Sequence, residues 1–395
     1  MVVTRTEKLL AELIALPSVN SAFVPQSVVG TARRAVRADA RAARPYLYYG
    51  EKNVADFLAS IAKRAGLEVE FQKVLPGRSN LIVRLRPRNK IRQTILLAPH
   101  LDTVGADDSQ FVPCRKNGRL YGRGACDTKG SVAAMFSALC ELANAKSRPR
   151  ETEIVFAGLI DEENAQAGSH ALVASRFKAD LAIVGEPTRL QVITAHKGSI
   201  WLELKTQGKA AHGATPQFGK NAVREMARIV DVLETDYAAR LRRCRHPLLG
   251  AATVNVGTIA GGTQPNIVPD HCAITIDRRT LPGETESGVR REISVLLRAK
   301  GLSAKISSAK PAPCLPLETN PKLPLIRQFL RSVGQRRPAG VDFFCDAAVL
   351  SAGGIPSVVF GPGDIAQAHT AEEWISLASL ERGKDLLLHF LLSLP

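Results

Sequence analysis

Residues 94–102, Thr-Ile-Leu-Leu-Ala-Pro-His-Leu-Asp, join an apolar run directly to an imidazole and a carboxylate. The run at 94–98 is short and apolar, which predicts a buried strand. Helical spacing of apolar residues follows Gly130, so strands and helices alternate. This alternation predicts an α/β core, a mostly parallel sheet flanked by helices. The other runs expected to form buried parallel strands are 81–83, 153–160, 181–184 and 357–360.

The pattern changes from about residue 197 onward. The expected elements are strand 199–206, helix 221–239, strands 252–259 and 271–277, helix 284–300 and strand 304–307. Their order is that of a ferredoxin-like α+β unit. Because an αβ pattern returns after the Pro-rich stretch 311–324, we expect this unit to be inserted into a discontinuous core. The core would comprise residues 1–196 and 309–395, and the insert residues 197–308.

The composition is that of an ordinary globular protein. Hydrophobic residues make up 45% and charged residues 23% of 395 positions, which excludes intrinsic disorder and collagen. No apolar stretch approaches the roughly 20 residues that cross a bilayer. The N-terminus is amphipathic rather than continuously apolar, and seven scattered cysteines form no CxxC pair. We therefore expect reduced thiols and a cytoplasmic location, with no membrane contact.

Ionisable side chains follow the predicted strands, at the ends where open α/β sheets place their sites. His100 and Asp102 follow strand 94–98. The other candidates are an acid in a glycine cluster, an adjacent acid pair, an acid before a proline and a late histidine: Asp127, Glu162 and Glu163, Glu186, and His369. Each one alone is more often a surface or turn residue. Together they would share one rim of one sheet, where repelling carboxylates need a cation.

Imidazoles and carboxylates without cysteine ligands suit one or two divalent ions. Zn²⁺ is the expected ion, with Co²⁺ or Mn²⁺ as alternatives. A single carboxylate that bridges two ions would make a hydrolytic two-metal site, and an unligated Glu nearby could move the proton. Hydrolysis of an amide needs these parts.

The motifs at 100–102, 122–130, 162–163, 185–187 and 369 resemble the metallopeptidase family of acetylornithine deacetylase, succinyl-diaminopimelate desuccinylase, aminoacylase and glutamate carboxypeptidase. The resemblance implies that Asp127 bridges two metal ions and that a metal-bridging water is the nucleophile. It implies Glu162 as general base and acid, and Asp102 as the residue that orients His100, although Asp102 could instead cap a turn. The ligands implied for the two ions are His100 with Glu186, and Glu163 with His369.

The insert carries three further resemblances. The segment 211–216 resembles the family's lid motif, which implies that His212 reaches the active site of the partner subunit in a homodimer. Preorganised donors of that kind stabilise a tetrahedral oxyanion. The segments 261–266 and 277–283 imply that Asn266 and Arg279 bind the carboxylate or carbonyl of the substrate. The simpler alternatives are an ordinary loop histidine for His212 and a salt bridge within the lid for Arg279.

The segment 361–370 looks most like acetylornithine deacetylase. This implies conversion of N-acetyl-L-ornithine to L-ornithine and acetate, a step of arginine biosynthesis. Nothing in the sequence marks an acid that would bind the ornithine side chain. Desuccinylation, aminoacylase activity and carboxypeptidase or dipeptidase activity therefore remain alternatives, with a small N-acyl amino acid or short peptide as substrate.

A strong positive charge motivates one hypothesis from another class. Lys and Arg number 53 against 37 Asp and Glu, a formal net charge of +16. The stretch 31–45 would present an arginine stripe if helical, and 240–245 holds four more arginines. Aromatic residues reach only 5% and no base-stacking motif accompanies these residues. Nucleic-acid binding is thus a remote alternative. The arginines concerned are Arg33, Arg37, Arg41, Arg44, Arg240, Arg242, Arg243 and Arg245.

Overall fold

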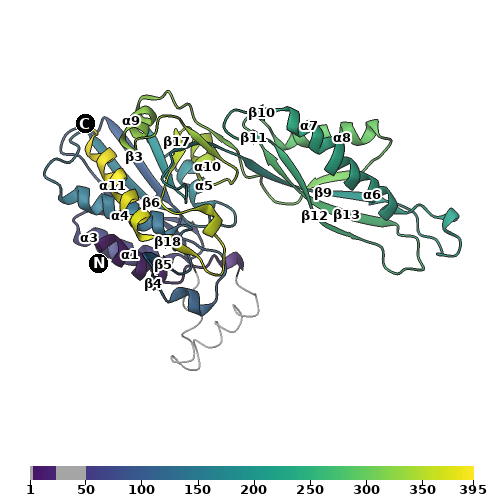
Figure 1. Cartoon of the computed structure of the whole chain (residues 1–395), viewed down its shortest axis with the longest axis horizontal. Coiled ribbons are helices and arrows are strands. Elements are labelled where there is room, and N and C mark those ends of the chain that lie inside the picture. Colours follow the sequence, from purple (N-terminus) through teal and green to yellow (C-terminus); the bar gives the residue numbers. More distant parts are fainter. Residues whose placement is uncertain (1–2, 24–49) are drawn as a thin grey trace. The chain divides into compact units, whose positions relative to one another are not determined.

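A computed structural model describes residues 3–23 and 50–395 (Figure 1). The Arg-rich stretch 31–45 lies outside the described residues. The chain forms two compact units, which we call the core unit and the inserted unit. The core unit comprises residues 1–194, 319–339 and 345–395, and the inserted unit residues 195–318 and 340–344. The expected fold class, a mostly parallel α/β core with a ferredoxin-like insert, is confirmed.

The core unit is built on one large sheet, in which four neighbouring strands run parallel. Their order is β6-β3-β7-β17, and the apolar runs predicted for all four are buried. Two short strands pair with β8 where the chain passes between the two units: β15 (Leu317–Glu318), whose residues belong to the inserted unit, and β16 (Ala339–Val341). The order along the sheet is β1 (Glu68–Leu75), β2 (Arg78–Leu85), β6 (Thr152–Gly158), β3 (Gln93–Pro99), β7 (Leu181–Gly185), β17 (Ser357–Val359), β8 (Ile193–His196), β15, with β16 paired to β8 off this path.

The prediction that residues 81–83 form a parallel strand was wrong. They lie in β2, which runs antiparallel to both of its neighbours, β1 and β6. A connection of two residues, Pro76 and Gly77, joins β1 to β2. So short a connection can join only antiparallel strands, because a parallel pair needs a crossover of a dozen residues or more.

Helix α4 (Lys129–Asn144) is the central helix of the core unit and confirms the helix expected after Gly130. It packs on β3, β6 and β7, with α1 (Arg5–Ile14) and α11 (Leu377–Leu392) beside it. Phe136 is fully buried and meets Phe156 of β6 edge to face, at 5.3 Å between ring centroids. Further α-helices among the described residues of this unit are α3 (Lys52–Arg64), α5 (Ala167–Ala174), α9 (Pro324–Ser332) and α10 (Ala347–Ala352).

A small three-stranded sheet lies next in the chain to the glycine-rich segment at residues 122–130 of the core unit. Its order is β18 (Trp374–Ser376), β5 (Arg119–Tyr121), β4 (Cys114–Lys116), with antiparallel pairing throughout. The sheet therefore ties the segment before α11 to the segment that leads into residues 122–130.

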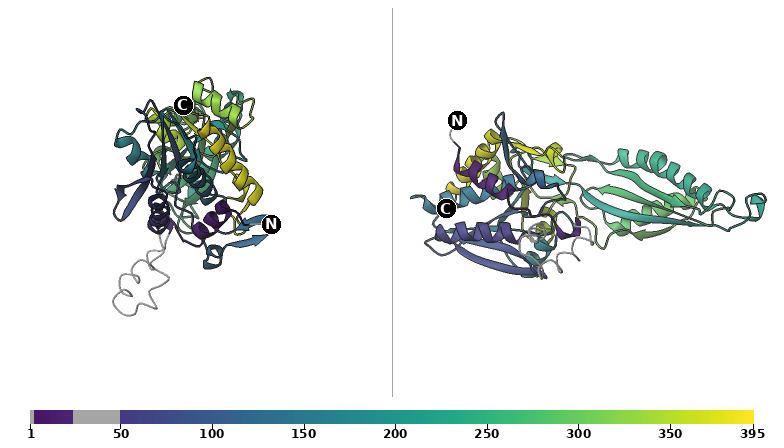
Figure 2. Two further views of the ribbon diagram at one scale, coloured as in Figure 1. Left: turned by 90° about the vertical axis from the view of Figure 1, so that its left-hand side faces the viewer. Right: turned by 90° about the horizontal axis from the view of Figure 1, so that it is seen from below.

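The inserted unit has a four-stranded antiparallel sheet in the order β12-β13-β9-β14. Its helices lie on one face of this sheet and share one buried cluster with it (Figure 2). The helix expected at 221–239 continues to residue 243 and includes a π-helical turn at 233–237. The elements are β9 (Gly198–Gln207), α6 (Ala222–Val232), α7 (Ala238–Arg243), β10 (Arg245–His246), β11 (Gly250–Ala251), β12 (Thr253–Gly261), β13 (His271–Thr280), α8 (Glu286–Ala299) and β14 (Lys305–Ser308).

All seven cysteines are free thiols. Within residues 3–23 and 50–395, no helix combines the length and the hydrophobicity that a membrane span requires.

Candidate metal centre

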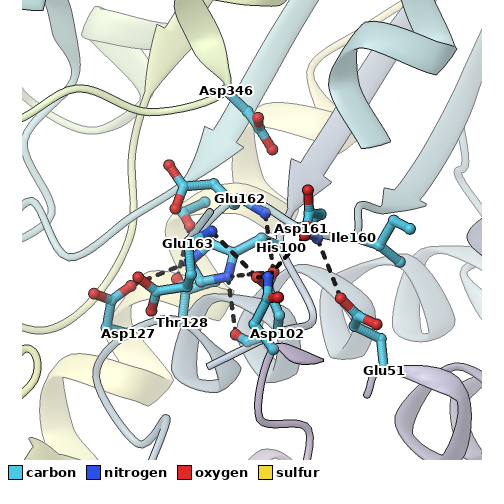
Figure 3. A network of polar contacts seen from close by, with 12 residues as sticks. Glu51, His100, Asp102, Asp127, Thr128, Ile160, Asp161, Glu162, Glu163 and Asp346 are labelled. Carbon is cyan, nitrogen blue, oxygen red and sulfur yellow. Dashed lines mark hydrogen bonds and ion pairs between the residues drawn. The ribbon is translucent and has the colours of Figure 1, made fainter. Parts of the chain in front are cut away.

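The candidate ligands follow strands of the core sheet. His100 comes directly after β3, Glu186 directly after β7, and Glu163 five residues after the end of β6. Asp127 precedes α4, and His369 follows β17 through a loop. Because β3, β6, β7 and β17 are parallel, their carboxyl ends meet at one edge of the sheet. The structure brings all five residues together at this edge (Figure 3 shows three of them).

Asp127 is the centre of this cluster, and each of its carboxylate oxygens faces a different imidazole. Oδ1 lies 3.1 Å from Nε2 of His100, and Oδ2 lies 3.3 Å from Nε2 of His369. Glu163 lies 3.1 Å from the same nitrogen of His369, and Glu186 lies 3.9 Å from Nε2 of His100. Asp127 therefore stands between two similar pairs of ligand atoms.

The donor set fits divalent metal ions. Zn–N and Zn–O bonds of about 2.0–2.2 Å at tetrahedral angles separate neighbouring ligand atoms by roughly 3.3–3.5 Å. The contacts around Asp127 are close to this spacing, and His100, Asp127 and Glu163 offer ligand atoms within 4.8 Å of one another. Oε1 of Glu186 is buried and has no hydrogen-bond partner among the described residues. Buried carboxylate oxygens normally accept a hydrogen bond, and an oxygen that ligates a metal ion would not need one from the protein.

The electrostatics of the cluster also favour a cation. Burial raises the pKa of Glu186 well above its usual range, and nearby Asp127 adds to the shift. Burial opposes protonation of His100, yet hydrogen bonds to Asp102 and Asp127 raise its pKa well above the usual range. Hydrogen bonds to Asp127 and Glu163 raise the pKa of His369 to about 10. Glu186 and the two imidazoles therefore bind protons readily in the protein alone, and a metal ion can replace those protons.

Glu162 lies in the same region as His100 and Glu163 (Figure 3). Its side chain has no hydrogen bond to His100 or Asp127 in the structure, whereas its backbone N–H donates to Oδ1 of Asp102 at 3.2 Å. Burial raises the pKa of the Glu162 carboxyl well above its ordinary value, with Glu186 and Asp346 as further causes. A carboxyl with a raised pKa beside a metal site is suited to take up and release a proton.

Asp102 makes both kinds of contact that the sequence left open. Nδ1 of His100 lies 3.0 Å from the Asp102 carbonyl oxygen and 3.4 Å from its carboxylate. The same carboxylate accepts the backbone N–H groups of Glu162 and Glu163, at 3.2 and 3.1 Å. Asp102 is fully buried, so it links the orientation of His100 to the backbone of the acid pair.

A buried network beneath this loop was not predicted from the sequence. Nδ2 of Asn20 donates to Asp102 at 2.7 Å and to Asp161 at 2.9 Å. Arg78 pairs with Asp161 at 3.0 Å and with Glu51, whose carboxylate also accepts the Asp161 backbone N–H at 3.2 Å. Asp161 adopts a left-handed φ of 68°, a conformation that Asp and Asn tolerate better than most residues. The network therefore holds the turn that presents the acid pair.

Two further acids near the site were also missed. Asp346 is buried and accepts a hydrogen bond from the Ser169 hydroxyl at 2.6 Å, while its Oδ2 has no partner among the described residues. Burial raises the pKa of Asp346 to about 7. Glu373 is buried against the loop that carries Asp127. Neither residue belongs to a sequence pattern that marks a site.

The three remaining candidates belong to the inserted unit. His212 is exposed, and its Nδ1 accepts the Ala214 backbone N–H at 3.1 Å. The Gly213 backbone N–H donates to the carbonyl of Asn266 at 2.7 Å, so the structure brings the His212 and Asn266 segments side by side. Arg279 pairs with Asp277 at 2.9 Å, which is the salt bridge considered as its alternative.

The fold and the cluster of histidines and carboxylates together define a metal-dependent amidohydrolase. Residues 96–393 match Peptidase family M20/M25/M40. This match covers well over half of the chain, and the chain belongs to that family.

Relatives and solved structures agree with this assignment. The chain is 31% identical to acetylornithine deacetylase from Myxococcus xanthus over 351 residues, which cover 84% of this chain and 89% of the relative. The aminopeptidase PepT from Bacillus cereus superposes with a TM-score of 0.74 at 22% identity, covering 98% of this chain and 97% of that structure. A protein from Bacillus subtilis, described as a dinuclear metal binding peptidase of the M20 family, gives 0.67 at 13% identity, with 98% and 97% covered.

Proposed function

We propose that this protein hydrolyses the amide bond of N-acyl-L-amino acids, with N-acetyl-L-ornithine as the preferred substrate. The single observation that carries the chemistry is the position of Asp127, whose two carboxylate oxygens face His100 and His369 at 3.1 and 3.3 Å. The choice of substrate is supported by acetylornithine deacetylase relatives at 31% and 30% identity. Release of L-ornithine would serve arginine biosynthesis.

The cluster would hold two divalent ions, with Zn²⁺ expected and Co²⁺ or Mn²⁺ as alternatives. His100 and Glu186 would complete one site, and Glu163 and His369 the other, with Asp127 shared. Ions bound there would polarise the amide carbonyl and lower the pKa of a bound water. Asp102, through its contacts with Nδ1 of His100, would keep that ring in the tautomer that leaves Nε2 free to ligate.

Glu162 would be the general base and acid. It lies beside the ligands but its side chain contacts none of them by a hydrogen bond, so it is free to accept a proton from the attacking water. It would then give this proton to the leaving nitrogen, which must be protonated before it departs as an amine. The buried network of Asp102 and Asn20 would hold the Glu162 backbone during both transfers.

Residues 197–308, which lie within the inserted unit, would form the lid and dimerisation domain of a cytoplasmic homodimer. His212 would supply a donor for the tetrahedral oxyanion in the partner's site, and Asn266 and Arg279 would bind the substrate carboxylate or carbonyl. Arg279 would have to exchange its ion pair with Asp277 for the substrate, or share it. Nucleic acid is not a proposed partner.

The test is a substrate panel on metal-free protein reconstituted with Zn²⁺, Co²⁺ or Mn²⁺. The panel contains N-acetyl-L-ornithine, N-succinyl-L-diaminopimelate, N-acetyl-L-methionine and a dipeptide, and metal content is measured in parallel. We expect two metal equivalents per chain and the highest kcat/KM on N-acetyl-L-ornithine. Rapid cleavage of the dipeptide beside unchanged N-acetyl-L-ornithine would reject the proposed substrate, whereas failure to bind any metal would reject the proposed centre.

A further inference from the structure

Glu373 is a buried carboxylate that the proposed chemistry does not use. It is the second acid of the pair Glu372–Glu373, directly before β18, and it is only 1% exposed. It lies four residues after His369 in the sequence. A carboxylate in such surroundings loses its hydration and must be compensated by hydrogen-bond donors.

Four donors converge on this carboxylate, and all of them come from the loop that ends at Asp127. Oε1 accepts the backbone N–H groups of Cys126 at 2.8 Å and of Asp127 at 2.9 Å. Oε2 accepts the backbone N–H of Gly124 at 3.0 Å and a guanidinium N–H of Arg123 at 2.7 Å. One side chain therefore satisfies three amides and one cation of a single short loop.

The loop needs such an acceptor because its backbone is irregular. Gly124 adopts a left-handed φ of 80°, and no strand partner pairs with residues 123–127 in the structure. Amides of a buried loop that lack an acceptor destabilise its conformation, and here the acceptor is a charged one, which gives shorter and stronger hydrogen bonds. The position of the Asp127 backbone is thus tied directly to Glu373.

The segment 369–373 contacts Asp127 twice. His369 faces the Asp127 side chain, with its Nε2 3.3 Å from Oδ2, and Glu373 binds the backbone N–H of the same residue. We propose that Glu373 is a positioning residue, which sets the Asp127 carboxylate between the two metal sites. This proposal rests on the proposed role of Asp127 as the shared ligand.

The test compares Glu373→Gln with a matched control, Glu372→Gln, at the exposed neighbouring position. Glutamine keeps the shape of glutamate but replaces one oxygen by an NH₂ group, which would face two donors instead of accepting from them. Zn²⁺ and Co²⁺ affinities of metal-free protein are measured by competition with a chelator, and folding is checked by circular dichroism and thermal unfolding.

We expect Glu373→Gln to bind metal about 10- to 100-fold more weakly than wild type, as for other groups that support metal ligands. The Co²⁺ absorption spectrum should change, excess metal should restore much of the kcat, and Glu372→Gln should match wild type. Wild-type metal affinity in folded Glu373→Gln would overturn the proposal, even if its melting temperature fell. Failure of wild type to bind metal would instead overturn the proposed function.

A second variant covers the case in which Glu373→Gln does not fold. Glu373→Asp keeps the charge and both oxygens but withdraws them by one methylene group from the loop amides. The proposal requires weaker metal binding in this variant as well, by less than in Glu373→Gln where both fold. Unchanged metal affinity in Glu373→Asp alongside an unfolded Glu373→Gln would show that Glu373 only stabilises the fold.

Discussion

Replacing Glu162 by Gln separates proton transfer from metal binding at this site. Glutamine has nearly the shape of glutamate but cannot accept the proton of the attacking water at neutral pH. The backbone N–H of residue 162 donates a hydrogen bond to Asp102 at 3.2 Å, and the substitution leaves this bond intact. The position of the residue should therefore survive while its chemistry is lost.

The expected loss follows from the general size of this effect. A positioned general base or acid contributes roughly 10²- to 10⁴-fold to the rate. At about 1.36 kcal/mol for each factor of ten, this corresponds to about 2.7–5.4 kcal/mol of transition-state stabilisation. Because Glu162 would act twice, first as base and then as acid, we expect a loss at the upper end of the range. KM should change little, since no ligand is removed.

The assay measures kcat on N-acetyl-L-ornithine by release of the free amine, together with metal content by elemental analysis. Glu163→Gln is the matched control, because Glu163 is adjacent but lies 3.1 Å from His369 within the ligand cluster. We expect Glu162→Gln to keep its metal and Glu163→Gln to bind metal weakly. The reverse pattern, metal lost from Glu162→Gln and kept in Glu163→Gln, would refute the assignment of the two acids.

Three other substitutions test separate parts of the structure. Asp127→Ala should empty both metal sites together, from two equivalents to none by elemental analysis, whereas loss of one equivalent would argue against a shared ligand. Burial raises the pKa of Asp346 from 3.8 to about 7. Protonated Asp346 therefore contributes to the free energy of unfolding below about pH 4, and this contribution is lost as the pH rises through 7. Asp346→Asn should remove this loss. In metal-free protein, the melting temperature of the variant minus that of wild type should therefore increase from pH 4 to pH 8, and a difference that stays constant with pH would contradict this. Arg78→Met leaves the buried Glu51 carboxylate without its cation and should lower the free energy of unfolding by about 3–5 kcal/mol in denaturant titrations; a change under about 1 kcal/mol would show that the pair is dispensable.

Most members of the ligand cluster could be predicted from the sequence because they follow a strand-like run, whereas Asp127 was marked by the glycine cluster that precedes α4. His100 and Glu186 come directly after β3 and β7, and the rule for open parallel sheets places such positions at one edge. The rule needs only a local pattern, which is a short apolar run and the residue after it. It nevertheless predicts contacts between residues that are far apart in the sequence. It was therefore enough to bring together residues as distant in the sequence as His100 and His369.

The residues that hold the ligand loops, such as Glu373, could not be predicted, because many of their partners are backbone groups that are the same in nearly every residue type. Glu373 binds backbone amides of residues about 250 positions earlier in the chain, and every residue except proline carries such an amide. In the sequence, Glu372 and Glu373 look like an ordinary solvated acid pair. The roles of Asn20 and Glu51 likewise depend on their hydrogen bonds with Asp102 and Asp161, which only the fold brings close to them.

The direction of β2 is a different kind of error. Its apolar run reports that the strand is buried, and burial does not distinguish a parallel from an antiparallel neighbour. The decisive signal was the two-residue link at Pro76 and Gly77, between two segments that each span eight residues. Connection length settles strand direction more firmly than hydrophobicity does.

The discontinuity of the core unit affects how the protein is made on the ribosome. His100, Asp127, Glu163 and Glu186 are synthesised first, then the whole inserted unit, and only afterwards the segment that holds His369 and Glu373. A nascent chain paused before this segment carries the crowded acids without His369. It also lacks Glu373, which accepts hydrogen bonds from the backbone of the Asp127 loop. Truncated translation products would therefore lack a finished site, even when the parallel strands beneath it have already formed.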